Sequence, residues 1–349
     1  MLSINKKKFG TLEGVDVDIY IVRNSNGLEL SITNYGGRVT SILVPNKSGK
    51  LENIVLGFDN LDDYLKDKYY LGAIIGRFAN RISKGVFNLE GKTYTLRVNN
   101  GSNHLHGGLK GFDKVVWDVK EVNCKSQKGI KLSYVSKDNE EGYPGNLNVE
   151  ISYLLTENNE IIIEYKAITD KSTPINLTHH GYFNLSGNFN NDVLNHELRI
   201  YSNEFLEMDE ESIPTGEYLS VDATSFDFKD FKRIGENIYD ENEQLEKGNG
   251  YDHCFVLGKD NQELKLVSEL SESISGRSME VYTTEPAIQF YSGNFLSKEE
   301  KNIGFGKRTG LCLETQHYPD SPNKAEFPST ILKPEDEYHS KTIYKFNTR

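Results

Sequence analysis

Short segments in which apolar and polar residues alternate dominate this sequence, and they narrow the possible folds more than any other feature. Residues 17–34 alternate on both sides of an Asn26-Gly27 turn, and residues 86–96 repeat the pattern around Glu90-Gly91. Because side chains alternate between the two faces of a β-strand, both segments are predicted to be β-hairpins. The same reasoning predicts further strands at residues 147–156, 159–169, 198–208, 251–258, 264–270, 279–285, 288–293 and 311–316.

Helical patterns are confined to two short segments, residues 59–70 and 228–238. No regular alternation of strands with helices occurs, which argues against Rossmann and TIM-barrel architectures. The sequence contains no linker, low-complexity tract or repeat of fixed period that would mark a domain boundary. We therefore predict an all-β protein, a large β-sandwich with a few short helices that forms a single domain over residues 1–349.

Charge and cysteine content restrict the partners and the compartment. The chain has 40 basic and 52 acidic residues and a net charge of −12, which disfavours nucleic acid or an anionic membrane as a partner. Three distant cysteines without a CxxC pair argue against a disulfide framework or a thiolate zinc site. Neither a signal peptide nor a membrane span is recognisable, so a cytoplasmic location is predicted. The sequence does not indicate an oligomeric state.

Two adjacent histidines lie in the segment NLTHHGYFNLSG, residues 176–187. On a strand, His180 shares the polar face with Tyr182, whereas His179 shares the apolar face with Leu177. We predict that His179 is a hydrogen-bonded core histidine and that His180 faces a polar cleft.

Glu314 is a second candidate, because it lies in a strand with apolar neighbours, where a carboxylate is costly unless it is paired or used. His104 and His106 flank one leucine and are expected to face the same way. Together with His180 and a carboxylate such as Glu314, these histidines could supply a His/His/carboxylate set, the ligand pattern of metal-dependent isomerases and oxygenases. Carboxylates that would orient such ligands are not identifiable, so two polar turn histidines are the alternative.

Six motifs occur in one order: GRFANRI, SNHLHGG, NLTHHGYFNLSG, YDH, IQFYSGNF and LETQHYPDSPN. From about Asn34 to the PDSPN segment, the chain resembles the aldose 1-epimerase (galactose mutarotase) family. The resemblance implies a single-domain β-supersandwich that interconverts the α and β anomers of free aldohexoses such as galactose and glucose, without cofactor or metal. It implies that His180 is the general acid and Glu314 the general base. It also implies sugar contacts at Asn80, Arg81, His106, Tyr182, Asp252 and Gln289.

One departure from the family pattern is His179, where the family usually has asparagine. Since His179 is predicted on the apolar face, this change is expected to be tolerated.

The reaction determines what the acid and the base must do. Opening a pyranose requires a proton on the ring oxygen and removal of the proton from the anomeric hydroxyl. A carboxylate is a ready base at neutral pH, and imidazole is an acid if a nearby group such as Glu314 stabilises its protonated form.

Three alternatives stay open at this point. A hexose-6-phosphate epimerase of the same fold would need cations around the phosphate, for which Arg77 and Arg81 are the main candidates. A carbohydrate-binding protein without catalysis would lack the acid or the base. A metal-dependent isomerase would lose activity in the presence of a chelator.

Overall fold

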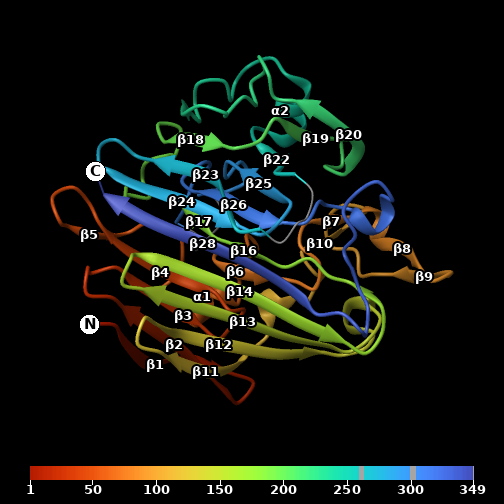
Figure 1. The fold of residues 1–349 in the computed structure, drawn as a ribbon, viewed down its shortest axis with the longest axis horizontal. Coiled ribbons are helices and arrows are strands. Elements are labelled where there is room, and N and C mark those ends of the chain that lie inside the picture. The colour runs from red at the N-terminus through yellow and green to blue at the C-terminus, as the bar shows by residue number, and fades with distance from the viewer. Residues whose placement is uncertain (259–262, 299–303, 349) are drawn as a thin grey trace.

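Strands account for 47% and helices for 6% of the computed structural model, which confirms the all-β prediction. The structure describes residues 1–258, 263–298 and 304–348. Three antiparallel sheets make up most of the molecule, and both chain termini lie on the same side of it (Figure 1). Among the described residues, no helix combines the length and apolar composition needed to cross a membrane.

The largest sheet has nine strands and crosses the middle of the molecule (Figure 1). Its strands, in spatial order, are β11 (Asp118–Asn123), β12 (Gln127–Ser136), β13 (Leu147–Thr156), β14 (Glu160–Thr169), β28 (Tyr338–Thr348), β24 (Arg277–Thr283), β23 (Lys265–Ser271), β18 (Glu197–Ile200) and β21 (Lys232–Arg233).

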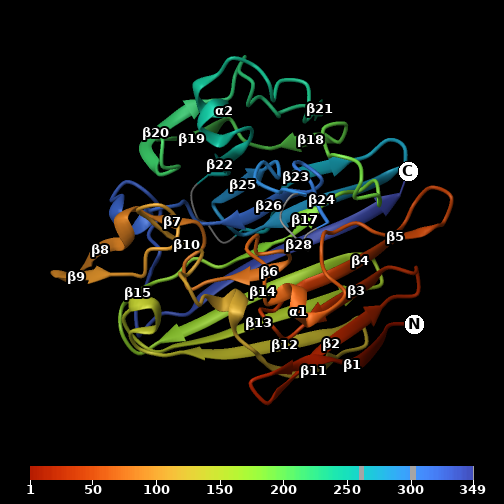
Figure 2. The same cartoon turned by 180° about the vertical axis from the view of Figure 1, so that it is seen from behind.

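Two further sheets complete the sandwich (Figure 2). The five-stranded sheet packs its first two strands against β12 and consists of β1 (Ser3–Leu12), β2 (Val15–Arg23), β3 (Glu29–Thr33), β4 (Val39–Pro45) and β5 (Leu51–Asn53). The six-stranded sheet consists of β17 (Tyr182–Phe183), β26 (Leu311–Gln316), β25 (Ala287–Tyr291), β22 (Asp252–Val256), β19 (Glu204–Met208) and β20 (Pro214–Ser220).

Short elements connect the sheets. The two-stranded ribbons pair β6 (Ala73–Ile75) with β16 (Thr178–His180), β7 (Arg81–Ile82) with β10 (His104–Leu105), β8 (Val86–Leu89) with β9 (Lys92–Thr95), and β15 (Thr173–Pro174) with β27 (Ile331–Leu332). The helices are α1 (Leu61–Tyr64) and α2 (Glu243–Gly248), with 3-10 turns η1 (Ser83–Gly85), η2 (Phe112–Lys114), η3 (Glu140–Gly142) and η4 (Ser321–Asn323).

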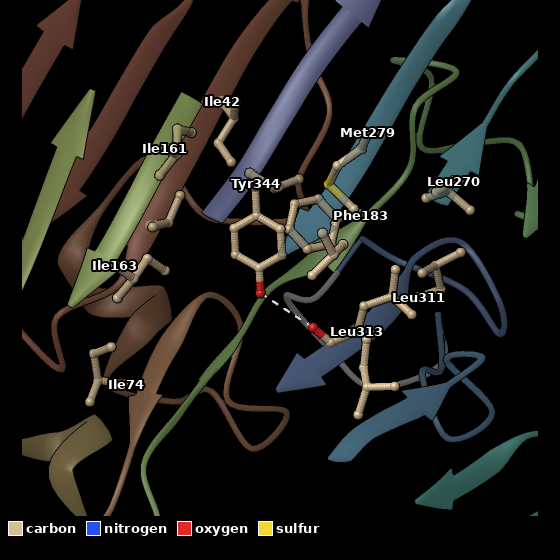
Figure 3. Close-up of a cluster of buried hydrophobic side chains, with 14 of the residues drawn as sticks. Ile42, Ile74, Ile161, Ile163, Phe183, Leu270, Met279, Leu311, Leu313 and Tyr344 are labelled. Atoms are coloured by element: carbon tan, nitrogen blue, oxygen red, sulfur yellow. Dashed lines mark hydrogen bonds between the residues drawn. The ribbon is translucent and has the colours of Figure 1, made fainter. Parts of the chain in front are cut away.

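One core is shared by the three sheets (Figure 3). Ile42 of β4, Ile163 of β14 and Leu313 of β26 are all members of it. The hydroxyl of Tyr344, on β28, donates to the Leu313 carbonyl at 3.2 Å and so links the nine-stranded sheet to the six-stranded one. Because Leu313 points into this core, its neighbour Glu314 must point to the opposite face of β26, as the alternation predicted.

Both predicted hairpins form, as β2–β3 and β8–β9, and every predicted strand segment contains a strand. The segment 59–70 contains only the single turn of α1. The predicted helix at 228–238 is wrong, because Lys232 and Arg233 form β21 at the edge of the large sheet. Pairing with that free edge outweighs a weak local helical preference. The observed helix α2 was not predicted. Its N-cap is Asn242, whose side chain accepts hydrogen bonds from the backbone N–H groups of Gln244 and Leu245.

The segment with the paired histidines forms two strands and not one, because the chain breaks at Gly181 and passes from β16 to β17, in different sheets. The predicted alternation of faces nevertheless holds. His179 lies in the interior against the rings of Tyr153 and Tyr344, at centroid distances of 6.1 and 6.0 Å. Within the described part of the chain neither ring nitrogen of His179 has a partner at good hydrogen-bond geometry, and its polar contact is with the backbone of Gly72.

Candidate active site

A polar pocket of about 300 Å³ lies where β22 and β26 of the six-stranded sheet meet the ribbons β6–β16 and β7–β10. It contains both predicted catalytic residues and five of the six predicted sugar-contacting residues. Its lining residues are Lys68, Tyr69, Tyr70, Asn80, Arg81, Asn100, Leu105, His106, His180, Tyr182, Asp252, Tyr291, Phe295 and Glu314.

Neighbouring strands bring the carboxylates together. Glu314 on β26 pairs with Gln289 on β25, and Tyr291 on β25 pairs with Asp252 on β22. Gln289 is not among the lining residues, but its Nε2 donates to Oδ1 of Asp252 at 2.7 Å. Gln289 is therefore placed to hold Asp252 against the pocket.

His180 and Glu314 face each other, with Nε2 and Oε1 3.8 Å apart. Both side chains are buried, at 5% and 3% exposure. Behind the imidazole, Sγ of Cys312 lies 3.5 Å from Nδ1. The second carboxyl oxygen of Glu314, Oε2, has no hydrogen-bond partner among the residues the structure describes. The pair thus keeps polar atoms available for a ligand.

His106 is fixed as a hydrogen-bond donor. The backbone N–H of Asn80 donates to the ring nitrogen Nδ1 of His106 at 3.1 Å. In return, the backbone N–H of His106 donates to the Asn80 carbonyl, also at 3.1 Å. Because Nδ1 accepts, the proton of the neutral ring lies on Nε2. Burial, together with the nearby His180 and Arg81, lowers the pKa of His106 well below its usual value. His106 is therefore a neutral donor.

His104 does not share this role, and the expectation that it faces the same way as His106 is wrong. Strand β10 ends at Leu105, and His106 has a left-handed backbone with φ of 51°, so the chain turns between the two histidines. Nδ1 of His104 lies 2.6 Å from the Arg97 carbonyl, and Nε2 lies 2.6 Å from the hydroxyl of Tyr143. Both nitrogens are thus used within the protein.

Burial controls the protonation of the pair. It lowers the pKa of His180 to about 3 and raises the pKa of Glu314 well above its usual value, to which the charge of Asp252 adds. Glu314 lies beside His180, but in the free protein the net shift of the His180 pKa is downward. Loss of hydration outweighs the attraction across 3.8 Å. Burial thus favours the neutral forms of both side chains in the free protein.

A metal could be held by His106, His180 and Glu314, since one ligand atom of each lies within 4.8 Å of the others. A histidine that binds metal normally donates its other ring N–H to an acceptor. Nδ1 of His106 instead faces the N–H donor of Asn80. If Nε2 bound a metal, the proton of the neutral ring would lie on Nδ1, where it would face the N–H of Asn80. This arrangement therefore argues against a resident metal.

Several pocket residues were not predicted: Lys68, Tyr69, Tyr70, Asn100, Leu105, Tyr291 and Phe295. Tyr291 could have been predicted from the sequence, because it lies two residues after Gln289 and therefore on the same face of the strand. The segment 68–70 lies at the end of the stretch predicted to be helical, and it reaches the pocket through the turn before β6. Arg77, a candidate cation from the sequence, lies outside the pocket and donates to the carbonyls of Pro144 and Gly145.

The buried histidines predict a strong pH dependence of stability. Burial lowers the pKa of His104 and His196 to about 4, and that of His179, His180 and His253 to about 3. The unfolded chain takes up these protons below about pH 6.5, whereas the folded protein does not. The free energy of unfolding is therefore highest above pH 6.5 and falls as the pH drops. Each histidine contributes up to about 1.4 kcal/mol per pH unit.

Urea unfolding at pH 7.5, 6.0 and 5.0 tests this dependence. The raised pKa values of four buried carboxyls, Asp113, Asp252, Glu314 and Asp320, act in the opposite sense, but they are fewer than the five histidines. The variant His179→Asn removes one buried histidine and is expected to lower the slope by up to about 1.4 kcal/mol per pH unit. Equal stability at pH 7.5 and 5.0 would contradict the prediction.

The β-sandwich and its His–Glu pocket define a class of proteins that carry out acid–base chemistry on a small polar molecule. The chain matches the family model described as aldose 1-epimerase over residues 18–345 and belongs to that family.

Named relatives agree with this assignment. The chain is 42% identical over 351 residues to the galactose mutarotase of Bos taurus, covering 99% of both chains. It is 37% identical over 338 residues to the aldose 1-epimerase of Escherichia coli K12, covering 96% of both. The crystal structure of galactose 1-epimerase from Lactobacillus acidophilus superposes with a TM-score of 0.90 at 28% identity, covering 100% of this chain and 99% of that one.

Proposed function

We propose that this protein is an isomerase, an aldose 1-epimerase that interconverts the α and β anomers of free aldohexoses such as galactose and glucose. The observation that carries the proposal is the facing pair of His180 Nε2 and Glu314 Oε1 in a pocket lined with hydrogen-bonding groups. The names of the relatives, galactose mutarotase and aldose 1-epimerase, support the substrate class.

The two groups act on two oxygens bonded to the same carbon. Glu314, as carboxylate, removes the proton of the anomeric hydroxyl while His180, as imidazolium, protonates the ring oxygen, and the C1–O bond of the ring breaks. The aldehyde then turns about its C1–C2 bond. On reclosure Glu314 returns its proton to the carbonyl oxygen and His180 takes the proton of the attacking hydroxyl. Each group finishes in its starting state, so no cofactor is consumed.

The starting state has the same proton count as the free pair, with the proton moved from Glu314 to His180. A sugar hydroxyl that donates to Glu314 favours its carboxylate form, and a ring oxygen that accepts from His180 favours its imidazolium form. Sugar binding therefore promotes the active arrangement. Each positioned acid or base typically contributes about 10² to 10⁴ in rate.

The remaining pocket residues are suited to hold hydroxyls. His106 donates through Nε2, Arg81 donates through its guanidinium, and Asn80 adds a side-chain amide. Asp252 accepts, held by Gln289. Tyr182 contributes an aromatic wall that is suited to the apolar face of a sugar.

We also infer a single domain, since the shared core includes both Leu2 and Phe346. A cytoplasmic location, the absence of metal and cofactor, and the absence of nucleic-acid and membrane partners stay predictions from the sequence.

Polarimetry of freshly dissolved α-D-galactose in buffer with EDTA tests the function. We expect the protein to speed relaxation to the same final rotation, because a catalyst does not move the equilibrium. No acceleration with EDTA, but acceleration after its removal, would favour a metal-dependent isomerase. No acceleration in either buffer would contradict the proposal and favour a phosphorylated substrate or a binding protein.

A further inference from the structure

Tyr70 contacts both histidines of the pocket, and neither the sequence motifs nor the mechanism assign it a role. The ring centroids of Tyr70 and His106 are 4.7 Å apart with an interplanar angle of 66°. Those of Tyr70 and His180 are 5.9 Å apart with an angle of 29°. His106 and His180 meet edge to face, 5.3 Å apart at 83°. Each of the three rings thus packs against the other two.

The backbone ties Tyr70 to the strand that carries His180. The Tyr70 carbonyl accepts the N–H of Ala73, and the N–H of Gly72 donates to the His180 carbonyl, both at 3.0 Å. Ala73 is also the partner of His180 in the β6–β16 ribbon. The turn that presents the Tyr70 ring is therefore anchored directly at His180.

His180 needs such support, because its own hydrogen bonds are weak. A catalytic imidazole is usually oriented by a carboxylate or carbonyl on the ring nitrogen away from the substrate. Here that nitrogen, Nδ1, lies 3.5 Å from the thiol of Cys312, which is a weak donor and a weak acceptor, and within the described residues no carboxylate lies at ion-pair distance from it. Ring contacts with Tyr70 and Tyr182 supply the orientation that a strong hydrogen bond would otherwise give.

We propose that Tyr70 is a positioning residue of this enzyme. Its aromatic ring holds the imidazoles of His180 and His106 at a fixed mutual angle, so that both point at the reacting end of the sugar. The ring and not the hydroxyl does this. The inference rests on the proposed function, since it concerns how the same pocket achieves its rate.

Two substitutions at Tyr70 separate the ring from the rest of the side chain. Tyr70→Phe keeps the ring and is expected to retain kcat within about threefold. Tyr70→Asn removes it, while asparagine tolerates the left-handed backbone at this position, where φ is 58°. Since a misplacement of about 1 Å can cost about 10²-fold in rate, Tyr70→Asn is expected to lower kcat of galactose mutarotation by about 10²-fold, with a much smaller change in KM.

The matched control is Tyr218→Asn. Tyr218 packs edge to face against Tyr318 and Phe327 and lies outside the pocket, so its loss is expected to leave kcat unchanged. If Tyr70→Asn does not fold, as judged by its thermal transition, Tyr70→Gly replaces it, because glycine also accepts the positive φ.

The outcomes separate this inference from the proposed function. Wild-type acceleration together with full kcat in the ring-deleted variant would overturn the role of Tyr70 alone. A Tyr70→Phe variant as slow as Tyr70→Asn would also overturn it, because the hydroxyl would then be the active part. No acceleration by the wild-type protein would overturn both proposals. Loss of kcat in Tyr70→Asn, with recovery in Tyr70→Phe, would support the positioning role.

Discussion

Replacement of Glu314 by glutamine is expected to lower kcat of galactose mutarotation by about 10² to 10⁴-fold, because the anomeric hydroxyl loses its base. Glutamine has nearly the same shape but cannot take up the proton. The fold is expected to persist, since Glu314 makes no ion pair closer than 3.8 Å and its Oε2 has no partner in the described structure. Polarimetry gives kcat, and a thermal unfolding curve gives the stability.

Glu272→Gln is the matched control for this variant. Glu272 is also a buried carboxylate, at 5% exposure, but it accepts the backbone N–H groups of Ile274 and Ser275 outside the pocket. Its replacement is expected to lower stability and to leave kcat within about twofold, the reverse of the Glu314 result. Full activity of Glu314→Gln would remove Glu314 from the role of base.

Replacement of His180 by glutamine is the second change with a large expected effect. The ring oxygen loses its proton donor, so kcat is expected to fall by about 10² to 10⁴-fold. His106 cannot replace it, because a proton on its Nδ1 would face the N–H donor of Asn80, so its ring does not become an imidazolium. KM is expected to change much less, since Asn80, Arg81 and Asp252 still line the pocket. Initial rates by polarimetry over a range of galactose concentrations give both constants.

The neighbouring histidine provides the control. His179→Asn changes a ring that packs against Tyr153 and Tyr344 in the interior, and asparagine is the residue expected at this position from the family resemblance. We expect this variant to keep kcat within about threefold. Similar losses in both variants would show that the strand, and not the imidazole of His180, is what the reaction requires. An active His180→Gln variant would exclude His180 as the acid.

The alternation of side chains along single strands was sufficient to assign several neighbouring residues to opposite faces of a strand. It placed His180 and His179 on different faces, and Glu314 opposite the core residue Leu313, because a strand has a period of two whatever it pairs with. The same rule missed β28, the central strand of the large sheet. Its inward side chains include Ser340 and Thr342, whose polarity hides the alternation.

The sequence by itself determined the β-rich architecture, the faces of its strands and, through its motifs, the family. Only the tertiary structure decided which candidates meet. It separated His104 from His106 at one left-handed residue, left Arg77 outside the pocket and brought in Tyr70 from a turn in a segment predicted to be helical. It also set the charge state of the pair, because burial is a property of the packed molecule. Local patterns fix the direction of a side chain, whereas pairing between distant segments fixes its neighbours and its hydration.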